Sequence, residues 1–255
     1  MTTGTVFALT DVSLRYGANH ALLNVNLTIR HGERVAVIGP SGAGKSSIIA
    51  LLNGTSMPTH GHVRVLSRDL AGATARALRD VQRRVGTIHQ QFNLVDQLRV
   101  VHNVNAGRLG DWPFWKSALS LLSPREVPEA REALRRVGIA DKLYERTSDL
   151  SGGEQQRVAI SRVLVQRPVA ILADEPIASL DPARGKEIIN LLHDISEETG
   201  TTFLASLHDV DMALERFDRI IGLRAGSIEF DTTPAQLARD DINALYALAL
   251  EQHPS

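Results

Sequence analysis

The sequence predicts an α/β fold in which helices cover both faces of a mainly parallel sheet. Three observations support this prediction. From residue 34 onward, short apolar runs of strand length alternate with amphipathic helical patterns. A glycine-rich turn joins one of these buried strands to the helix that follows it. A long block, residues 93–167, has helical patterns and no convincing strand, which indicates a helical insertion into the α/β core.

The first part of the chain is expected to form antiparallel strands. Residues 5–30 alternate short apolar stretches with turn signals, and Val25, Leu27 and Ile29 have the period of two that is typical of a half-buried strand. The elements expected next are a buried strand at residues 34–38, a helix at 46–52, and strands at 63–66 and 85–88.

The second part alternates helices and strands after the insertion. We expect helices at residues 129–137 and 154–166, a strand at 169–173, a helix at 186–198, a strand at 201–207, a helix at 210–216, and a hairpin of strands at 220–223 and 227–230. This divides the chain into a core (residues 1–92 and 168–240), which includes an antiparallel β subdomain, a helical subdomain (93–167) and a C-terminal tail (241–255).

The composition excludes several classes of protein. The 28 basic and 29 acidic residues nearly cancel, which does not suit a protein that binds nucleic acid by counterion release, so we expect no nucleic-acid partner. The absence of cysteine excludes a disulfide scaffold, a thiol nucleophile and a thiolate metal site. No apolar run is long enough to span a membrane and no signal-peptide pattern is visible, so we expect a cytoplasmic protein.

Four arginines, Arg76, Arg79, Arg83 and Arg84, lie roughly on one face of a helical pattern. A nucleic-acid surface is one interpretation of such a run. Asp80 interrupts it, however, and the chain as a whole is neutral. We therefore expect a solvated helix face.

Residues 39–46 match the phosphate-binding pattern G-x-x-x-x-G-K-[ST] in full. Glycines let backbone N–H groups approach phosphate oxygens closely, and the helix that begins near Lys45 adds its positive N-terminal dipole. Lys45 supplies a positive charge to the β- and γ-phosphates, and Ser46 offers a hydroxyl to Mg²⁺. The sequence therefore predicts a phosphate-loop NTPase core that binds ATP and Mg²⁺, rather than a glycine-rich turn with an incidental lysine.

A second site is expected where the apolar run at residues 169–173 ends in two carboxylates, Asp174 and Glu175. Ligands of parallel sheets bind at the carboxyl ends of the strands. Asp174 is expected to hold Mg²⁺ through water, and Glu175 to act as the general base that polarises the attacking water. A solvated strand end is the alternative.

At residues 150–157, Leu-Ser-Gly-Gly-Glu-Gln-Gln-Arg, the sequence resembles the signature of the ABC-type ATPases. Ser151 can cap a helix, and two glycines leave the N–H groups of that helix open to an anion. The resemblance covers about residues 5–235 and implies the ABC ATPase fold. In this family the phosphate loop of one chain faces the signature of a second chain, so the resemblance implies a homodimer that closes on ATP.

The resemblance also assigns roles to single residues. Tyr16 matches the aromatic that stacks on adenine, although core packing of this strand residue is the alternative. Gln90 matches the glutamine that reaches Mg²⁺ and the attacking water and links to the transport partner, and His208 matches the histidine that contacts the γ-phosphate. The other implied residues are the nucleotide-binding Gly39, Pro40, Ser41, Gly42, Ala43, Gly44, Lys45, Ser46 and Ser47, the signature residues Ser151, Gly152, Gly153 and Glu154, the dimer-loop residues Ser179, Leu180 and Asp181, and the metal ligands Ser46, Gln90 and Asp174.

Within the family, several segments are similar to the ATPases of phosphonate importers. These are residues 91–95, 107–110, 173–182, 207–211 and 218–226, and Ile177 matters most because most ABC ATPases have threonine there. His89 in place of phenylalanine and Asp209 in place of glutamine depart from the pattern. The resemblance implies uptake of phosphonate, phosphite or a related oxyanion, with a membrane permease and a periplasmic or lipid-anchored binding protein as partners, at the cytoplasmic face of the membrane.

Other functions remain open at this stage. The main alternative is the ATPase of an amino-acid importer or of an exporter with the same fold. A soluble mechanochemical ABC protein would have tandem cassettes or a coiled-coil arm, and neither is present. A phosphate-loop kinase or GTPase would need an acceptor site or an Asn-Lys-x-Asp string that reads guanine, and that string is absent. Trp112 and Trp115 in the helical insertion either pack within their own subdomain or line a groove for the permease beside Gln90.

Overall fold

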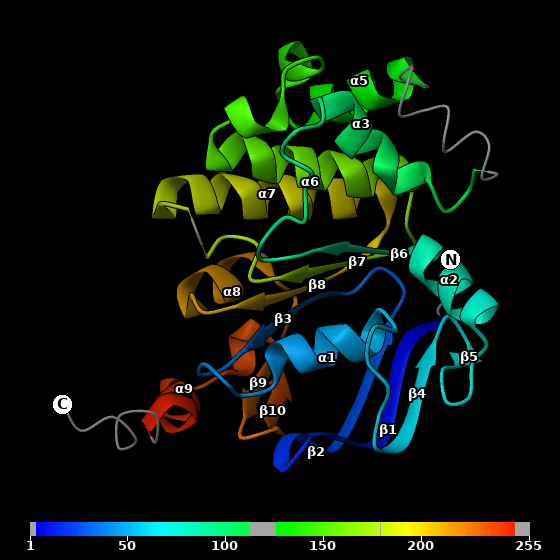
Figure 1. The fold of residues 1–255 in the computed structure, drawn as a ribbon. Helices are drawn as coiled ribbons and strands as arrows, with labels where there is room; N and C mark the ends of the chain where they lie inside the picture. The colour runs from blue at the N-terminus through cyan, green and yellow to red at the C-terminus, as the bar shows by residue number, and fades with distance from the viewer. Residues whose placement is uncertain (1–3, 113–125, 179, 248–255) are drawn as a thin grey trace.

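The computed structural model describes residues 4–112, 126–178 and 180–247, which form two sheets with helices on their faces (Figure 1). The larger sheet has six strands in the order β10-β9-β3-β8-β7-β6. Five of them run parallel, and β10 is antiparallel to β9 at one edge. Their bounds are β3 (Arg34–Ile38), β6 (Val85–Ile88), β7 (Ala170–Asp174), β8 (Thr202–Leu207), β9 (Arg219–Arg224) and β10 (Ser227–Thr232). The predicted mainly parallel sheet is confirmed.

The smaller sheet is antiparallel and has the order β2-β1-β4-β5. Its strands are β1 (Thr5–Tyr16), β2 (Asn19–Arg30), β4 (His60–Val65) and the two-residue β5 (Arg68–Asp69). Val25, Leu27 and Ile29 of β2 are buried, as their period of two predicts. The expected antiparallel N-terminal strands are thus present.

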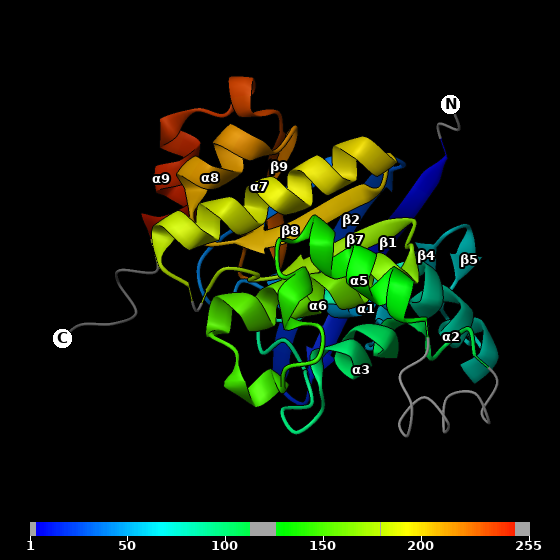
Figure 2. The same ribbon diagram turned by 90° about the horizontal axis from the view of Figure 1, so that it is seen from above.

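Helix α1 (Lys45–Leu52) packs between the two sheets. Its apolar side chains Ile48, Ile49, Leu51 and Leu52 join one hydrophobic core with residues of both sheets. The opposite face of the larger sheet forms a second core with the helices drawn above it in Figure 1. These helices are α3 (Val100–Asn105), α5 (Val127–Arg136), α6 (Gly152–Gln166) and α7 (Pro182–Thr199), and α8 (Val210–Arg216) belongs to the same core. Figure 2 shows these helices from above. The expected α/β layers are therefore observed.

The described part of residues 93–167 contains helices and no strand, as expected. Besides α3, α5 and α6 it has three short 3₁₀ turns, η1 (Ala106–Arg108), η2 (Ala140–Lys142) and η3 (Thr147–Asp149). The sequence did not predict α3, which has only six residues and is almost completely buried, so it lacks an amphipathic pattern. Its apolar residues Val100, Val101 and Val104 pack in the second core.

The described residues contain three further elements: α2 (Ala75–Arg84), η4 (Pro234–Gln236) and α9 (Arg239–Ala247). The residues expected to form a C-terminal tail thus begin as part of a helix. Leu245 of α9 is 2% exposed and lies in the second core. Among the described residues, no helix combines the length and apolar character that crossing a membrane requires.

Strand β6 and helix α6 approach each other closely at Gly86. A Cβ added there would lie 2.4 Å from Cγ1 of Val163 and 3.2 Å from Cγ of Pro168. This strand leads into the turn with Gln90, and α6 begins after Ser151. Because Gly86 has no side chain, β6 and α6 can pack closely. Both elements border segments for which the sequence predicts functions.

We predict that Gly86→Ala destabilises the fold by about 1–3 kcal/mol, because the added methyl group overpacks a well-filled contact. Urea denaturation should show this as a lower midpoint with an unchanged slope. Gly4→Ala is the matched control, since nothing lies within 4 Å of a Cβ at that position. A Gly86→Ala chain as stable as wild type would contradict the close packing of β6 on α6.

Candidate functional site

The phosphate-binding pattern at residues 39–46 runs from the end of β3 into the first turn of α1. Gly39 and Gly44 have φ angles of 151° and 106°, a region that favours glycine. A Cβ at Gly39 would lie 2.0 Å from the carbonyl oxygen of Leu223, and one at Gly44 would lie 2.5 Å from that of Ala21. Neither position therefore has room for another residue. The loop is therefore packed against β9 of the larger sheet and β2 of the smaller sheet.

Lys45 folds back over this loop. Its Nζ donates to the carbonyl oxygens of Gly39, at 2.9 Å, and Pro40, at 3.1 Å, and the residue is only 4% exposed. Burial lowers the pKa of the Lys45 ammonium below its usual value, while the carboxylates of Glu175 and Asp174 oppose that shift. The ammonium is therefore partly desolvated and held over the loop that the sequence assigns to phosphate binding, a suitable position for contact with a polyphosphate.

Asp174, at the end of β7, receives two hydroxyl donors on one oxygen. Ser46 Oγ lies 3.0 Å and Ser206 Oγ 2.8 Å from Asp174 Oδ1. Ser46 comes from α1 and Ser206 from β8, so three elements converge on one carboxylate oxygen. The parallel pairing of β7 with β8 sets Asp174 directly beside Ser206.

Glu175 is fixed from two sides. Its backbone N–H donates to Ser206 Oγ at 2.9 Å, and its Oε1 lies 2.6 Å from His208 Nε2. Its φ of +46° is uncommon for a residue other than glycine and turns the chain sharply after β7. The side chain is 18% exposed and that of His208 is 44% exposed, so the pair faces a partly open space. The structure thus brings together five residues that the sequence predicted, namely Lys45, Ser46, Asp174, Glu175 and His208.

Ser206 is the residue of this site that the sequence analysis missed. It is completely buried, and its hydroxyl donates to Asp174 while it accepts from the backbone of Glu175. A signal was present: a serine near the end of a strongly apolar strand and two residues before His208. A buried hydroxyl needs a hydrogen-bond partner, and the carboxyl end of the neighbouring strand supplies one.

Tyr16 and Gln90 stay separate from this cluster. Tyr16 is 52% exposed and its hydroxyl lies 3.0 Å from Ser56 Oγ, so the alternative of core packing is wrong. Gln90 is exposed in the turn after β6, and no hydrogen bond joins its side chain to any residue that the structure describes. Tyr16 therefore presents a half-exposed aromatic ring, and Gln90 presents an amide without a hydrogen-bond partner among the described residues.

The signature residues form a different surface. Ser151 caps α6, where its backbone N–H donates to Glu154 Oε2 at 2.9 Å and its hydroxyl accepts from the Glu154 backbone. Leu180 lies beside this end of the helix, Asp181 caps α7 by accepting from the Arg184 N–H, and Ser179 lies outside the described residues. A small hollow is lined by Ser151, Gly153, Glu154 and Leu180, together with residues of α7, and by none of residues 39–46. One chain therefore keeps the signature apart from its own phosphate loop.

The residues present fit a magnesium ion. Ser46 and Asp174 offer a hydroxyl and a carboxylate within hydrogen-bond distance of each other, and oxygen ligands of this kind suit Mg²⁺. Within residues 4–112, 126–178 and 180–247, no group of three or more His, Cys, Asp or Glu side chains could hold a metal. This agrees with Mg²⁺, which commonly takes only one or two protein carboxylates and completes its coordination with phosphate oxygens and water.

Comparisons with known proteins agree with these features. Residues 22–178 match the family described as ABC transporter. The phosphonates import ATP-binding protein PhnC 1 of Pseudomonas aeruginosa is 46% identical over 227 residues, which cover 89% of this chain and 85% of the relative. PhnC of Pseudomonas putida, of the same description, is 44% identical over 239 residues, 94% of this chain and 89% of the relative.

Solved structures show the same fold. The cassette MJ0796, in a dimeric post-hydrolysis state bound to ADP and Pi, superposes with a TM-score of 0.76 and 32% identity. The match covers 89% of this chain and 98% of that cassette.

We predict that Ser206→Ala slows ATP hydrolysis by about 10- to 100-fold, because it removes a donor to a carboxylate, a bond of about 1.5–3 kcal/mol, and leaves the Glu175 N–H unpaired. Steady-state phosphate release by the folded fraction measures this. The control is Ser196→Ala, which removes another buried serine, whose hydroxyl donates to the Thr201 carbonyl just before β8, at the opposite end of that strand from the site. Equal turnover of both variants would show that Ser206 does not position the carboxylates.

Proposed function

The chain belongs to the ABC transporter family, and from this premise we propose that it is the ATP-binding subunit of an importer for phosphonate or a related phosphorus oxyanion. ATP hydrolysis on this chain drives uptake through a separate membrane permease. The observation that carries the substrate class is the 46% identity with a phosphonate-import ATP-binding protein over 89% of the chain. The observation that supports hydrolysis is the meeting of Lys45, Asp174, Glu175 and His208 at the ends of β3, β7 and β8.

ATP binds with its phosphates on the loop of residues 39–47. The backbone N–H groups of the loop and the start of α1 meet the phosphate oxygens, and the Lys45 ammonium leaves the carbonyls of Gly39 and Pro40 for the β- and γ-phosphates. Phosphate charge offsets the desolvation that lowers the pKa of Lys45, so binding favours its protonated form. The half-exposed ring of Tyr16 stacks on the adenine.

Hydrolysis needs a base for the water that attacks the γ-phosphate. Glu175 is the carboxylate that fills this role, because it lies next to the phosphate-binding loop and its backbone is fixed by Ser206. Its contact with His208 orients the carboxylate, and His208 turns toward the γ-phosphate once ATP is bound. Gln90, on the free turn after β6, closes on the same water.

We propose that Mg²⁺ is held by Ser46, Asp174 and Gln90. When bound, it neutralises charge on the β- and γ-phosphates. The hydrogen bond from Ser206 then keeps Asp174 in place, as it does in the structure.

The complete site needs two copies of the chain. Ser151, Gly152, Gly153 and Glu154 of the second copy cover the γ-phosphate, and its residues 179–181 contact the first copy. Support comes from the separation of the signature hollow from the loop within one chain, and from the dimeric state of the similar cassette MJ0796. ATP then lies between the two copies, and hydrolysis releases them.

The remaining partners follow from the importer assignment. Permease subunits form the membrane path, and a periplasmic or lipid-anchored protein delivers the oxyanion. The chain works at the cytoplasmic face of the membrane as a peripheral subunit. It does not bind nucleic acid, which agrees with its balance of 28 basic and 29 acidic residues.

We predict that Glu175→Gln lowers ATP hydrolysis by about 10²–10⁴-fold and leaves ATP binding intact, because the amide keeps the size of the side chain but accepts no proton. In the host organism, a strain without the gene should regain uptake of labelled methylphosphonate from the wild-type chain and not from Glu175→Gln. Uptake of a labelled amino acid in the same strains is the control. Restored amino-acid uptake without phosphonate uptake would contradict the proposed substrate class, and hydrolysis at the wild-type rate would contradict the role of Glu175.

A further inference from the structure

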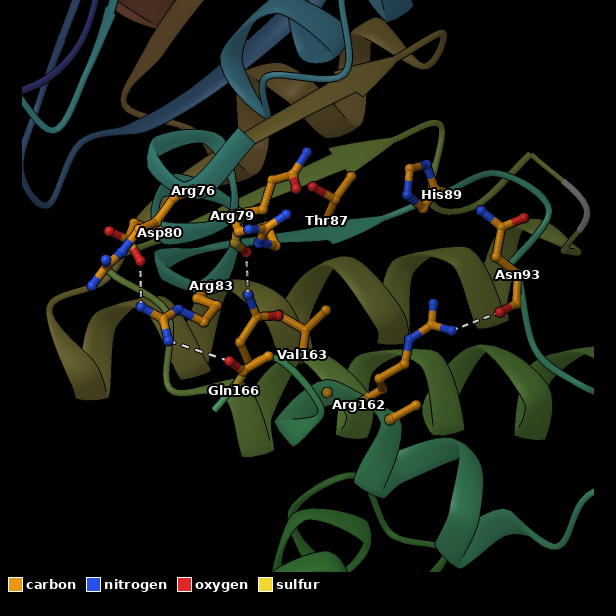
Figure 3. Close-up of a pocket in the computed structure, with 14 residues that line it drawn as sticks. Arg76, Arg79, Asp80, Arg83, Thr87, His89, Asn93, Arg162, Val163 and Gln166 are labelled. Atoms are coloured by element: carbon orange, nitrogen blue, oxygen red, sulfur yellow. Dashed lines mark hydrogen bonds and ion pairs between the residues drawn. The ribbon is translucent and has the colours of Figure 1, made fainter. Parts of the chain in front are cut away.

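Three arginines of α2 line a hollow beside α6. Arg76, Arg79 and Arg83 lie across from Arg162 of α6 around a space of about 680 Å³ (Figure 3). The sequence predicts a solvated helix face here, and Arg76 and Arg79 are exposed. None of the described residues that line the hollow belongs to the phosphate loop at residues 39–46, so this surface lies apart from the loop.

Trp112 is not part of that hollow either. It is 8% exposed, which favours packing within its own subdomain over contact with the permease. Trp115, the second aromatic that the sequence analysis considered, lies outside the described residues.

Helix α9 is attached to the end of β9 (Figure 1). Arg224, the last residue of that strand, donates from Nη1 to the carbonyl oxygen of Ala244 in α9 at 2.9 Å. The residue before it is Leu223, whose carbonyl oxygen packs against Gly39 at the start of the phosphate loop. One strand end therefore contacts both the C-terminal helix and the loop.

The position of α9 depends on a few contacts near its end. Of the residues of α9, Leu245 is buried, and the ring of Tyr246 packs against the same second core. A hollow of about 300 Å³, lined by Asp241 of α9 and Phe230 of β10 among others, separates part of the helix from the hairpin of β9 and β10. The contacts at residues 244–246 are thus the ones that hold α9 beside the loop.

The hydroxyl of Tyr246 lies at the start of the phosphate loop. It is buried and makes no hydrogen bond of standard geometry with the described residues. Burial raises the pKa of Tyr246, and the backbone N–H of Gly39 opposes that shift, because it faces the phenol oxygen. A buried hydroxyl needs a partner, and the Gly39 N–H is the group in position to become one.

Gly39 is also held through its carbonyl group. Lys45 Nζ donates to the Gly39 carbonyl oxygen at 2.9 Å, and in the proposed function Lys45 leaves this oxygen for the phosphates of ATP. Gly39 then keeps its packing on Leu223 and its neighbour on the N–H side, Tyr246. The support that remains on this residue during ATP binding therefore comes from β9 and α9.

We propose that Tyr246 is a positioning residue of the ATP site, whose hydroxyl accepts a hydrogen bond from the Gly39 N–H and holds the start of the phosphate loop in place while Lys45 binds the phosphates. The proposal rests on the proposed function, since it concerns the loop that binds ATP there. Arg224 and Leu245 keep α9 where Tyr246 reaches the loop. Because Tyr246 acts on the loop and not on the nucleotide base, it affects every triphosphate ligand alike.

The test uses the isolated full-length chain and the variant Tyr246→Phe, which removes only the hydroxyl. We expect the Kd values for ATP and for inorganic tripolyphosphate both to rise by about 3- to 10-fold, the range for a lost hydrogen bond between uncharged groups. In hydrolysis the loss should fall mainly on KM. Tyr144→Phe is the matched control, since Tyr144 is 50% exposed in the helical subdomain. A lower urea midpoint with unchanged Kd values would make Tyr246 a merely structural residue and overturn the proposal.

A second measurement follows Tyr246 directly. The chain has three tyrosines, so incorporated 3-fluorotyrosine gives three ¹⁹F signals, which Tyr→Phe variants assign. Saturating tripolyphosphate should shift the Tyr246 signal and leave the Tyr144 signal in place. An unmoved Tyr246 signal in a chain that has bound tripolyphosphate would contradict the proposed hydrogen bond.

Lys45→Ala separates a failure of this proposal from a failure of the proposed function. If Lys45→Ala weakens the binding of both ligands and Tyr246→Phe weakens neither, the role of Tyr246 alone is wrong. If the wild-type chain binds neither ligand, or Lys45→Ala binds both normally, the proposed function fails at its phosphate loop and this proposal fails with it. A loss in Tyr246→Phe that is confined to ATP would place Tyr246 at the base and would also reject the proposal.

Discussion

One carboxylate oxygen, Oδ1 of Asp174, holds the candidate site together. Hydroxyl groups from the first turn of α1 and from β8 donate to it, and both distances are at or below 3.0 Å. The arrangement requires β7 and β8 to pair in parallel and the glycine-rich loop to bring α1 over their ends. The glycines at positions 39 and 44 are part of the same constraint, because no larger residue fits against Leu223 and Ala21 there. Phosphate binding, the base and the metal ligands all depend on this meeting point.

Helix α6 connects the signature residues to the loop that follows Gln90. Ser151 caps its first turn, and Arg162, eleven residues later, holds the loop of Phe92 and Asn93. At about 1.5 Å per residue these points are about 16 Å apart on one rigid element. Any rotation of α6 therefore moves the signature end and the loop after Gln90 together. In the proposed function, the signature end covers the γ-phosphate of the second copy and Gln90 closes on the attacking water, so α6 connects these two events.

Local patterns in the sequence predicted most of the fold. The strand at residues 34–38, the loop after it and α1 follow from an apolar run, a glycine-rich string and an amphipathic segment, and the hairpin of β9 and β10 from a turn between two apolar runs. The ATP-site residues Lys45, Asp174 and Glu175 were predicted because their types and order carry the chemistry. In contrast, α3 escaped prediction because it is short and buried on nearly all sides. Ser206 also escaped, since its partner Asp174 comes from a strand that is distant in the sequence.

The central claim is that each ATP site is built from two copies of the chain, and mixing two defective chains tests it most directly. Lys45→Ala lacks the charge for ATP but keeps its signature, whereas Ser151→Arg combined with Glu175→Gln keeps its phosphate loop and blocks its signature. With ATP, light scattering should find each chain alone as a monomer. The mixture should contain a species with the mass of two chains, because the loop of one chain meets the intact signature of the other. A mixture that stays monomeric at every ATP concentration would contradict the shared site.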